Sequence, residues 1–182
     1  MSRAWEPIAL KRDCTATTVP AGQVVMLTEG GEVEIVQQLG GSVTVRTEMG
    51  SLLRIAGADA DALGLEIPDG PAAATGDGPF DMDHVTEALD QVYDPEIPVS
   101  IVQLGLVYRC EEVVDADGAR RIEIDMTMTA PGCGMGDVLQ ADATRAVRAV
   151  PGVDDVVVNL VWEPRWSIHR MPEATRLQLG LM

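Results

Sequence analysis

Short runs of alternating hydrophobic and polar residues fill the first third of the chain. The runs are rich in β-branched residues, and turns containing glycine separate them. Alternation with a period of two is typical of strands that bury one face. The pattern predicts strands over residues 15–19, 24–27, 33–37, 42–47 and 52–55. We expect these strands to form a small, partly closed β-barrel, followed by a helical turn at residues 59–64 that an aspartate caps.

The period changes after residue 80. Apolar residues from Val85 to Val92 recur at helical spacing behind Asp81 and Asp83, which can cap a helix, and Asp94-Pro95 ends it. The remaining pattern predicts a hairpin at 105–114 and 120–129, a helix at about 134–149, a strand at 153–161 and a short helix ending near Gly180. Helix, strand, strand, helix and strand in this order predict a compact α+β layer.

The stretch from Pro68 to Pro79 contains mainly proline, glycine, alanine and aspartate, without an apolar period. Such a composition is typical of a linker. We therefore expect a β-rich N-terminal domain at residues 1–67, a linker at 68–79 and an α+β domain at 80–182.

The charge of the chain narrows the choice of partners. The 29 acidic and 13 basic residues among 182 give a formal net charge of −16, which would repel nucleic-acid phosphates and anionic membranes. No apolar run approaches the length of a membrane-spanning helix or a signal peptide, so we expect a cytoplasmic protein that contacts neither nucleic acid nor membrane. The three cysteines form no CxxC motif, which argues against a disulfide framework and a closed zinc site.

Cys133 lies in the turn MTMTAPGCGMGD at residues 126–137, which leads from a predicted strand into a predicted helix. The free N–H groups and positive dipole end of a helix start favour a thiolate there, as in a reactive or metal-binding cysteine. Gly132 and Gly134 would let the backbone approach a ligand closely. A glycine-rich turn around a buried, inert cysteine remains the alternative.

Asp94 and Glu96 lie in the segment YDPEIP at residues 93–98, where two prolines favour an extended chain. Residues two apart in an extended chain face the same way, so both carboxylates would project to one side. They could ligate a metal together with a thiolate, or accept hydrogen bonds from a loop and hold it in place. The alternative is structural, with Asp94 capping a turn and Glu96 in an ion pair.

The other candidate groups favour structural roles. Cys110 shares a predicted strand face with core residues, and Cys14 begins the β-rich domain without a partner nearby. His84 and His169 are the only histidines, and no spacing places either as a base for Cys133. The segment from Trp162 to Trp166 could cover the Cys133 turn or contact another protein.

Three ordered motifs resemble the PaaD-like domain family, which includes PaaD and cytosolic iron–sulfur assembly factors. They are DPEIPVSIVQLGLVY at 94–108, MTMTAPGCGMGDVLQ at 126–140 and VNLVWEPRW at 158–166. The earlier segments VPAGQVV, VQQLGGSVTV and DADALGL resemble SufT-type members, which carry an extra domain before this one. The resemblance implies a fold like the C-terminal domain of NifU and a role in maturing iron–sulfur proteins.

The resemblance also assigns roles to residues. It implies that Cys133 is the reactive cysteine, Asp94 with Glu96 the acidic motif, and Thr129 the threonine of the supporting loop. Trp162 and Trp166 would belong to a partly exposed segment that contacts a partner. NifU-type scaffolds use a CxxC, whereas one thiolate cannot complete the four ligands of a cluster. Iron or a labile cluster would therefore be shared across a homodimer, with a partner or with a small thiol.

These observations support a non-catalytic factor that works with the iron–sulfur assembly machinery and helps deliver iron or a cluster to client apoproteins. One rival is a cysteine-dependent enzyme with Cys133 as nucleophile, which lacks a histidine placed as base. Another is a structural adaptor in which Cys133 is inert.

We predict that Cys133 is the most reactive of the three thiols, because it alone lies at a glycine-flanked helix start. Iodoacetamide labelling at neutral pH, resolved by mass spectrometry, measures the three rates in the folded protein. Faster modification of Cys14 or Cys110 would contradict this assignment.

Overall fold

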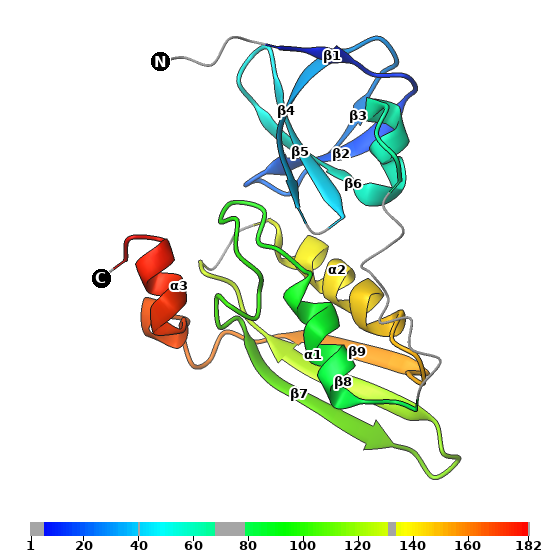
Figure 1. Ribbon diagram of the computed structural model, residues 1–182, viewed down its shortest axis with the longest axis vertical. Helices are drawn as coiled ribbons and strands as arrows, with labels where there is room; N and C mark the ends of the chain where they lie inside the picture. Colours follow the sequence, from blue (N-terminus) through cyan, green and yellow to red (C-terminus); the bar gives the residue numbers. More distant parts are fainter. Residues whose placement is uncertain (1–5, 40, 68–78, 131–133, 182) are drawn as a thin grey trace. The chain divides into compact units, whose positions relative to one another are not determined.

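The computed structural model describes residues 6–39, 41–67, 79–130 and 134–181 (Figure 1). The chain divides into two compact units, residues 1–70 and 71–182. Of the predicted linker, residues 68–78 lie outside the described residues.

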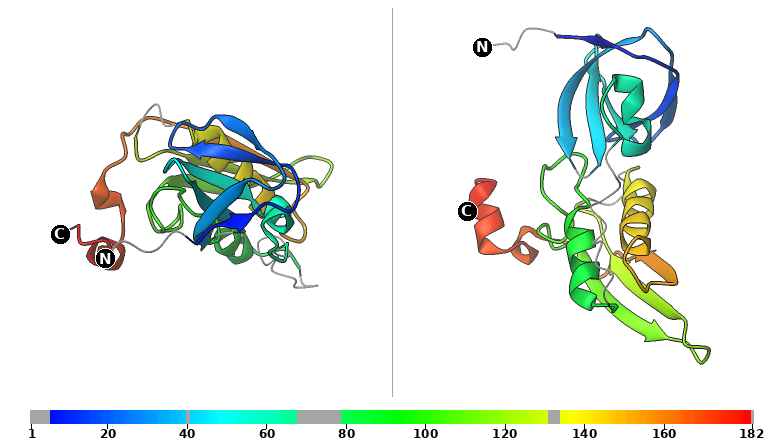
Figure 2. Two further views of the ribbon diagram at one scale, coloured as in Figure 1. Left: turned by 90° about the horizontal axis from the view of Figure 1, so that it is seen from above. Right: turned by 45° about the vertical axis from the view of Figure 1, so that its right-hand side comes forward.

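The first unit contains one curved sheet of six strands (Figure 2). Its order is β1-β4-β5-β6-β2-β3, and every neighbouring pair is antiparallel. The strands are β1 (Ile8–Ala9), β2 (Cys14–Val19), β3 (Val24–Leu27), β4 (Glu32–Leu39), β5 (Ser42–Thr47) and β6 (Leu52–Ala56). The five predicted strands are confirmed. The two residues of β1 are too few for their periodicity to be recognised in the sequence.

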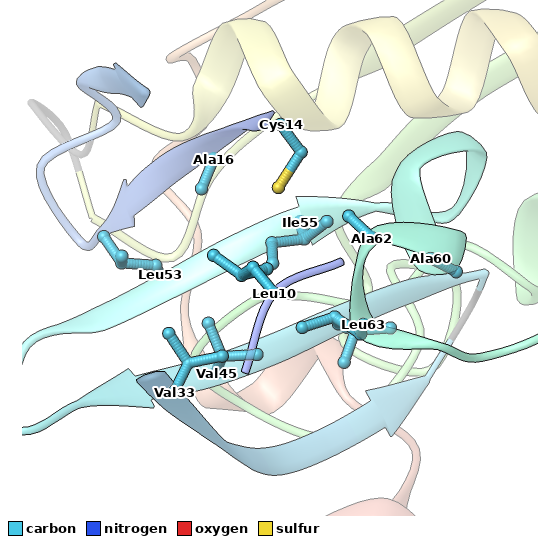
Figure 3. Close-up of a cluster of buried hydrophobic side chains, with 11 residues drawn as sticks. Leu10, Cys14, Ala16, Val33, Val45, Leu53, Ile55, Ala60, Ala62 and Leu63 are labelled. Atoms are coloured by element: carbon cyan, nitrogen blue, oxygen red, sulfur yellow. The ribbon is translucent and has the colours of Figure 1, made fainter. Parts of the chain in front are cut away.

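The core of this unit lies between the inward face of the sheet and the 3-10 helix η1 (Gly57–Leu63) (Figure 3). From the strands, Val45 and Ile55 are fully buried, and Cys14 is buried as expected. From η1, Ala60 and Ala62 are fully buried, and their small side chains allow the helix to pack closely on the sheet.

The aspartates of η1 bind Arg12 and do not cap the helix. The N-cap residue is Ala56, which makes no side-chain capping bond, so the predicted aspartate cap is wrong. Arg12 Nε donates to Asp61 Oδ2 at 2.8 Å, and Arg12 Nη2 donates to Asp59 Oδ1 at 3.0 Å. The arginine beside Asp61 lowers the pKa of that carboxyl group. The two ion pairs therefore attach η1 to the segment that precedes β2.

The second unit pairs β7 (Val107–Val114) with β8 (Arg120–Met126) as an antiparallel hairpin, and β8 with β9 (Asp155–Leu160) in parallel. Helices α1 (Met82–Asp90) and α2 (Gly136–Arg148) lie on one face of this sheet (Figure 1). A 3-10 helix η2 (Ile168–Arg170) and the short helix α3 (Glu173–Gln178) follow. The predicted order of the elements is confirmed, whereas the likeness to the C-terminal domain of NifU stays a prediction.

The two faces of the sheet differ as its sequence pattern predicts. Ile122 and Ile124 are fully buried beneath the helices, while Glu123 and Asp125 lie on the opposite face. There Arg109 Nε donates to Asp125 Oδ2 at 2.7 Å and lowers the pKa of that carboxyl group. Alternation thus separates an apolar core from a face of ion pairs.

Asp81 caps α1 as predicted, because its carboxylate accepts a hydrogen bond from the Asp83 N–H at 2.9 Å. The helix ends at Asp90, earlier than Asp94-Pro95. None of the helices in the described ranges has both the length and the apolar character needed to cross a membrane.

Candidate functional site

A pocket of about 310 Å³ opens in the second unit where the segments after β8 and β9 meet. One wall comes from the residues that follow β8, and the other from the segment WEPRW that follows β9. We call it the tryptophan pocket. Its described lining residues are Thr127, Met128, Thr129, Ala130, Trp162, Glu163, Arg165 and Trp166.

The pocket depends on the parallel pairing of β8 with β9. Met126 lies opposite Leu160 in the register, so both strands end at one edge of the sheet. Beyond that edge, the Val161 N–H donates to the Met126 carbonyl at 2.8 Å. The start of α2 reaches the same edge, because a Cβ at Gly136 would lie only 3.2 Å from Leu160 Cδ1. Three segments that are distant in sequence therefore converge here.

We call the side of the pocket formed by residues 162–166 the tryptophan wall. Two hydrogen bonds and one stacking contact hold it in place. Trp166 Nε1 donates to the Leu104 carbonyl at 2.8 Å, and the Tyr108 hydroxyl donates to the Pro164 carbonyl at 2.8 Å. The Arg170 guanidinium lies over the Tyr108 ring, with 3.9 Å between its carbon and the ring centre. The loop before β7 and the first residues of β7 thus position the wall.

Gly105 permits the close approach between this loop and η2. Its φ of 67° is in the left-handed region, and a Cβ there would lie 2.5 Å from the Arg170 carbonyl oxygen. Only glycine satisfies both requirements, so the position fixes the distance between the loop and the C-terminal segment.

Asp94 and Glu96 do not face the same way. Asp94 is buried, and its Oδ1 accepts hydrogen bonds from the N–H groups of Glu96 and Ile97, both at 2.9 Å. The chain bends through residues 95–99, and Glu96 is exposed. The predicted extended segment with two parallel carboxylates is therefore wrong. Burial raises the pKa of Asp94, and the two backbone hydrogen bonds oppose that shift.

The turn at Asp94 is connected to the tryptophan wall through the following loop. A bridge pairs Tyr93 with Ser100, whose hydroxyl donates to the Asp90 carboxylate. The Leu104 N–H then donates to the Ser100 carbonyl at 2.9 Å. Among the described lining residues of the pocket, neither Asp94 nor Glu96 is present. In this structure Asp94 braces the loop that supplies the Leu104 carbonyl to Trp166.

The other predicted site residues fall into three groups. Cys133 and Gly132 lie outside the described residues, between Ala130 and Gly134. Thr129 lines the pocket together with Trp162, which is 44% exposed, and Trp166. Gly134 is exposed just before α2. The structure thus brings the threonine and both tryptophans to one pocket.

Sequence reasoning missed the charged residues of the tryptophan wall. Glu163 and Arg165 both line the pocket. Opposite charges set between two tryptophans directly after the last strand of the sheet were the available signal, because residues at the end of a strand often carry function.

No group of three or more histidine, cysteine, aspartate or glutamate residues that could hold a metal exists among the described residues. Burial raises the pKa of the Cys14 and Cys110 thiols, which favours their protonated, unreactive form. Neither histidine belongs to the described lining of the tryptophan pocket.

The profile of the family described as "Iron-sulfur cluster assembly protein" matches residues 82–160. A relative from Porphyromonas gingivalis, "Fe-S protein maturation auxiliary factor", is 40% identical over 54% of this chain and 90% of its own length. The "Fe-S protein maturation auxiliary factor YitW" of Bacillus subtilis is 36% identical, over 54% and 93%. The "Fe-S protein maturation auxiliary factor SufT" of Staphylococcus aureus is 37% identical, over 50% and 98%.

Gly105→Ala should destabilise the second unit and loosen the tryptophan wall, because the new Cβ would clash with the Arg170 carbonyl. Gly118→Ala is the matched control, since Gly118 also has a positive φ but nothing lies within 4 Å of its Cβ position. We expect the loss to exceed that of the control by about 1–3 kcal/mol in urea unfolding, as for other overpacked positions. Equal losses would show that backbone strain alone governs both positions.

Asp94→Asn should preserve the fold, because the amide oxygen can still accept from Glu96 and Ile97. Because burial raises the pKa of Asp94, the protonated carboxyl group stabilises the fold fully below the unfolded-state pKa of about 3.9. This stabilisation is lost as the pH rises through the folded-state pKa. The melting temperature of the variant relative to wild type should therefore be higher at about pH 7 than at about pH 4. The opposite trend would show that the two backbone hydrogen bonds outweigh the burial of the carboxylate.

Proposed function

This chain belongs to the family of iron–sulfur cluster assembly proteins, and on that premise we propose that it is an iron–sulfur protein maturation factor. It would work with the iron–sulfur assembly machinery in the cytoplasm and assist the assembly or delivery of iron or an iron–sulfur cluster to client apoproteins. Cys133 would supply the thiolate that holds this cargo. The names of the relatives, which are maturation auxiliary factors, support the proposal.

The tryptophan pocket is the observation that carries the proposal. Its wall at Thr129 and Ala130 continues in sequence directly into Pro131, Gly132 and Cys133. Gly136, at the other end of this short segment, packs against the end of β9. Both attachment points of the Cys133 turn therefore lie at the edge of the sheet where the pocket opens. A cargo bound in the pocket would lie beside the side chains of Trp162 and Trp166.

The charges of the pocket suit a cargo of either sign. Glu163 offers a carboxylate to ferrous iron, which is a cation. Arg165 offers a guanidinium to a cluster bound by thiolates, which carries net negative charge. Asp94 would act indirectly, by bracing the loop that positions Trp166, and the exposed Glu96 would be free to contact cargo or client.

The ligand count indicates transient binding. Cys133 provides one thiolate, and the described residues hold no cluster of three or more candidate ligands. The remaining ligands would come from a partner, a second copy or a small thiol. In transfer, each iron–sulfur bond to Cys133 breaks as a client thiolate forms its own bond to the same iron, without oxidation or reduction. A weakly held cargo is the form that a client can remove.

Two alternatives make different predictions. A cysteine-dependent enzyme would need a base beside Cys133, and the described pocket lining contains no histidine to serve as one. A structural adaptor would work equally well without the thiol. We favour delivery because the pocket offers space, aromatic walls and both signs of charge, and its described lining contains no histidine.

Cys133→Ser should abolish cargo binding without unfolding the protein. We would reconstitute wild type and variant anaerobically with ferrous iron and sulfide, record the absorption spectrum, and then measure activation of an apo-form iron–sulfur enzyme. We expect at least a tenfold slower activation with the variant.

Cys110→Ser is the matched control, because its thiol is half-buried in β7 and its pKa is raised. It should behave as wild type in both measurements. Normal delivery by Cys133→Ser would favour the adaptor, and loss of delivery with both variants would remove the special role of Cys133.

A further inference from the structure

Strand β3 forms one edge of the sheet in the first unit and carries no charged residue. It contains Val24, Val25, Met26 and Leu27, and its one neighbour in the sheet is β2. An uncharged, apolar edge is unusual, because unpaired strand edges invite other chains to pair with them.

The backbone groups of two β3 residues point away from the sheet. The Thr18 N–H donates to the Gln23 carbonyl at 2.8 Å, which makes Thr18 and Gln23 a hydrogen-bonded pair. Because bonding alternates along an antiparallel pair, Val24 and Met26 lie at non-bonded positions opposite β2. Their N–H and C=O groups therefore face outward, and among the described residues none of the backbone hydrogen bonds of turns, loops and caps involves them.

The side chains of the same two residues are exposed. Val24 is 74% exposed and Met26 is 64% exposed on the outer face, while Val25 and Leu27 pack against the core. An incoming strand would thus meet free hydrogen-bonding groups and apolar side chains at the same positions.

The other sheet edges are protected. The strand β1 has only two residues. The edge strand β7 carries Arg109, Glu111 and Glu112, and the edge strand β9 begins with Asp155. Short length and charged side chains are the usual means of preventing edge pairing. β3 lacks both a charge and a proline.

We infer that β3 is a docking edge to which an extended segment of another protein adds as a strand. The segment alternates apolar with small polar residues, so that its apolar side chains lie beside Val24 and Met26. Basic residues flank it, because residues 1–79 contain 11 acidic against 5 basic residues, a net charge of −6.

A second copy of this chain fits the edge less well. It carries the same net charge of −16, and it could offer only the same four-residue strand. That contact would bury far less than the roughly 1,200 Å² typical of a stable interface. A flexible segment can instead continue past both ends of β3. The inference goes beyond the proposed function, because docking at β3 requires neither iron nor Cys133.

A peptide-binding experiment tests the docking edge. The probe is a fluorescein-labelled synthetic peptide of alternating valine and threonine with two arginines at each end, and binding to the full chain is followed by anisotropy. We expect wild type to bind this peptide at least tenfold more tightly than a peptide with glutamates at its ends. Met26→Lys should weaken binding at least tenfold.

Met49→Lys is the matched control, because Met49 is 93% exposed in a turn and the substitution changes the charge equally. It should bind as wild type. A peptide methylated on alternate backbone nitrogens tests wild type directly, should Met26→Lys fail to fold, and it should not bind. Unchanged binding by Met26→Lys or by the methylated peptide would overturn the inference. So would a wild-type dimer, seen by sedimentation equilibrium, that Met26→Lys dissociates.

Discussion

The parallel pairing of β8 with β9 is the constraint on which the second unit depends. A parallel pair needs a crossover, and α2 supplies it while covering one face of the sheet. The same pairing ends both strands at one edge, so Thr129 and Trp162 meet although they are distant in sequence. The tryptophan pocket is therefore a consequence of topology before it is a consequence of any single side chain.

The loop from Asp94 to Leu106 connects the turn at Asp94 to the tryptophan wall of this pocket. Asp94 holds the turn through two backbone N–H groups, and Leu104 offers its carbonyl to Trp166. The pocket wall is thus fixed by hydrogen bonds between backbone and side chain, which are strongly directional. The buried carboxylate of Asp94 positions this loop, and its burial costs desolvation free energy.

Periodicity predicted most of the fold because it reports directly on burial. The strand from Arg120 to Met126 alternates so clearly that its two faces could be assigned in advance. Periodicity could not reveal β1, which is too short, or the end of α1 at Asp90, because Val92 stays buried beyond the helix. Nor could it reveal that Asp94 turns inward, since its side chain competes with the extended chain for backbone N–H groups. To predict that Glu163 and Arg165 line the pocket, one would have to know which strand ends lie together.

The crossover also determines the order in which the strands of this sheet can pair during folding. The hairpin of β7 and β8 joins neighbours in sequence, whereas β9 must wait for the whole of α2 before it can pair. Contacts between distant residues form late, because the chain must first lose more conformational entropy. On the ribosome, the Thr127–Ala130 wall emerges well before the tryptophan wall. A newly made chain thus presents an unfinished pocket until the segment after β9 has been synthesised.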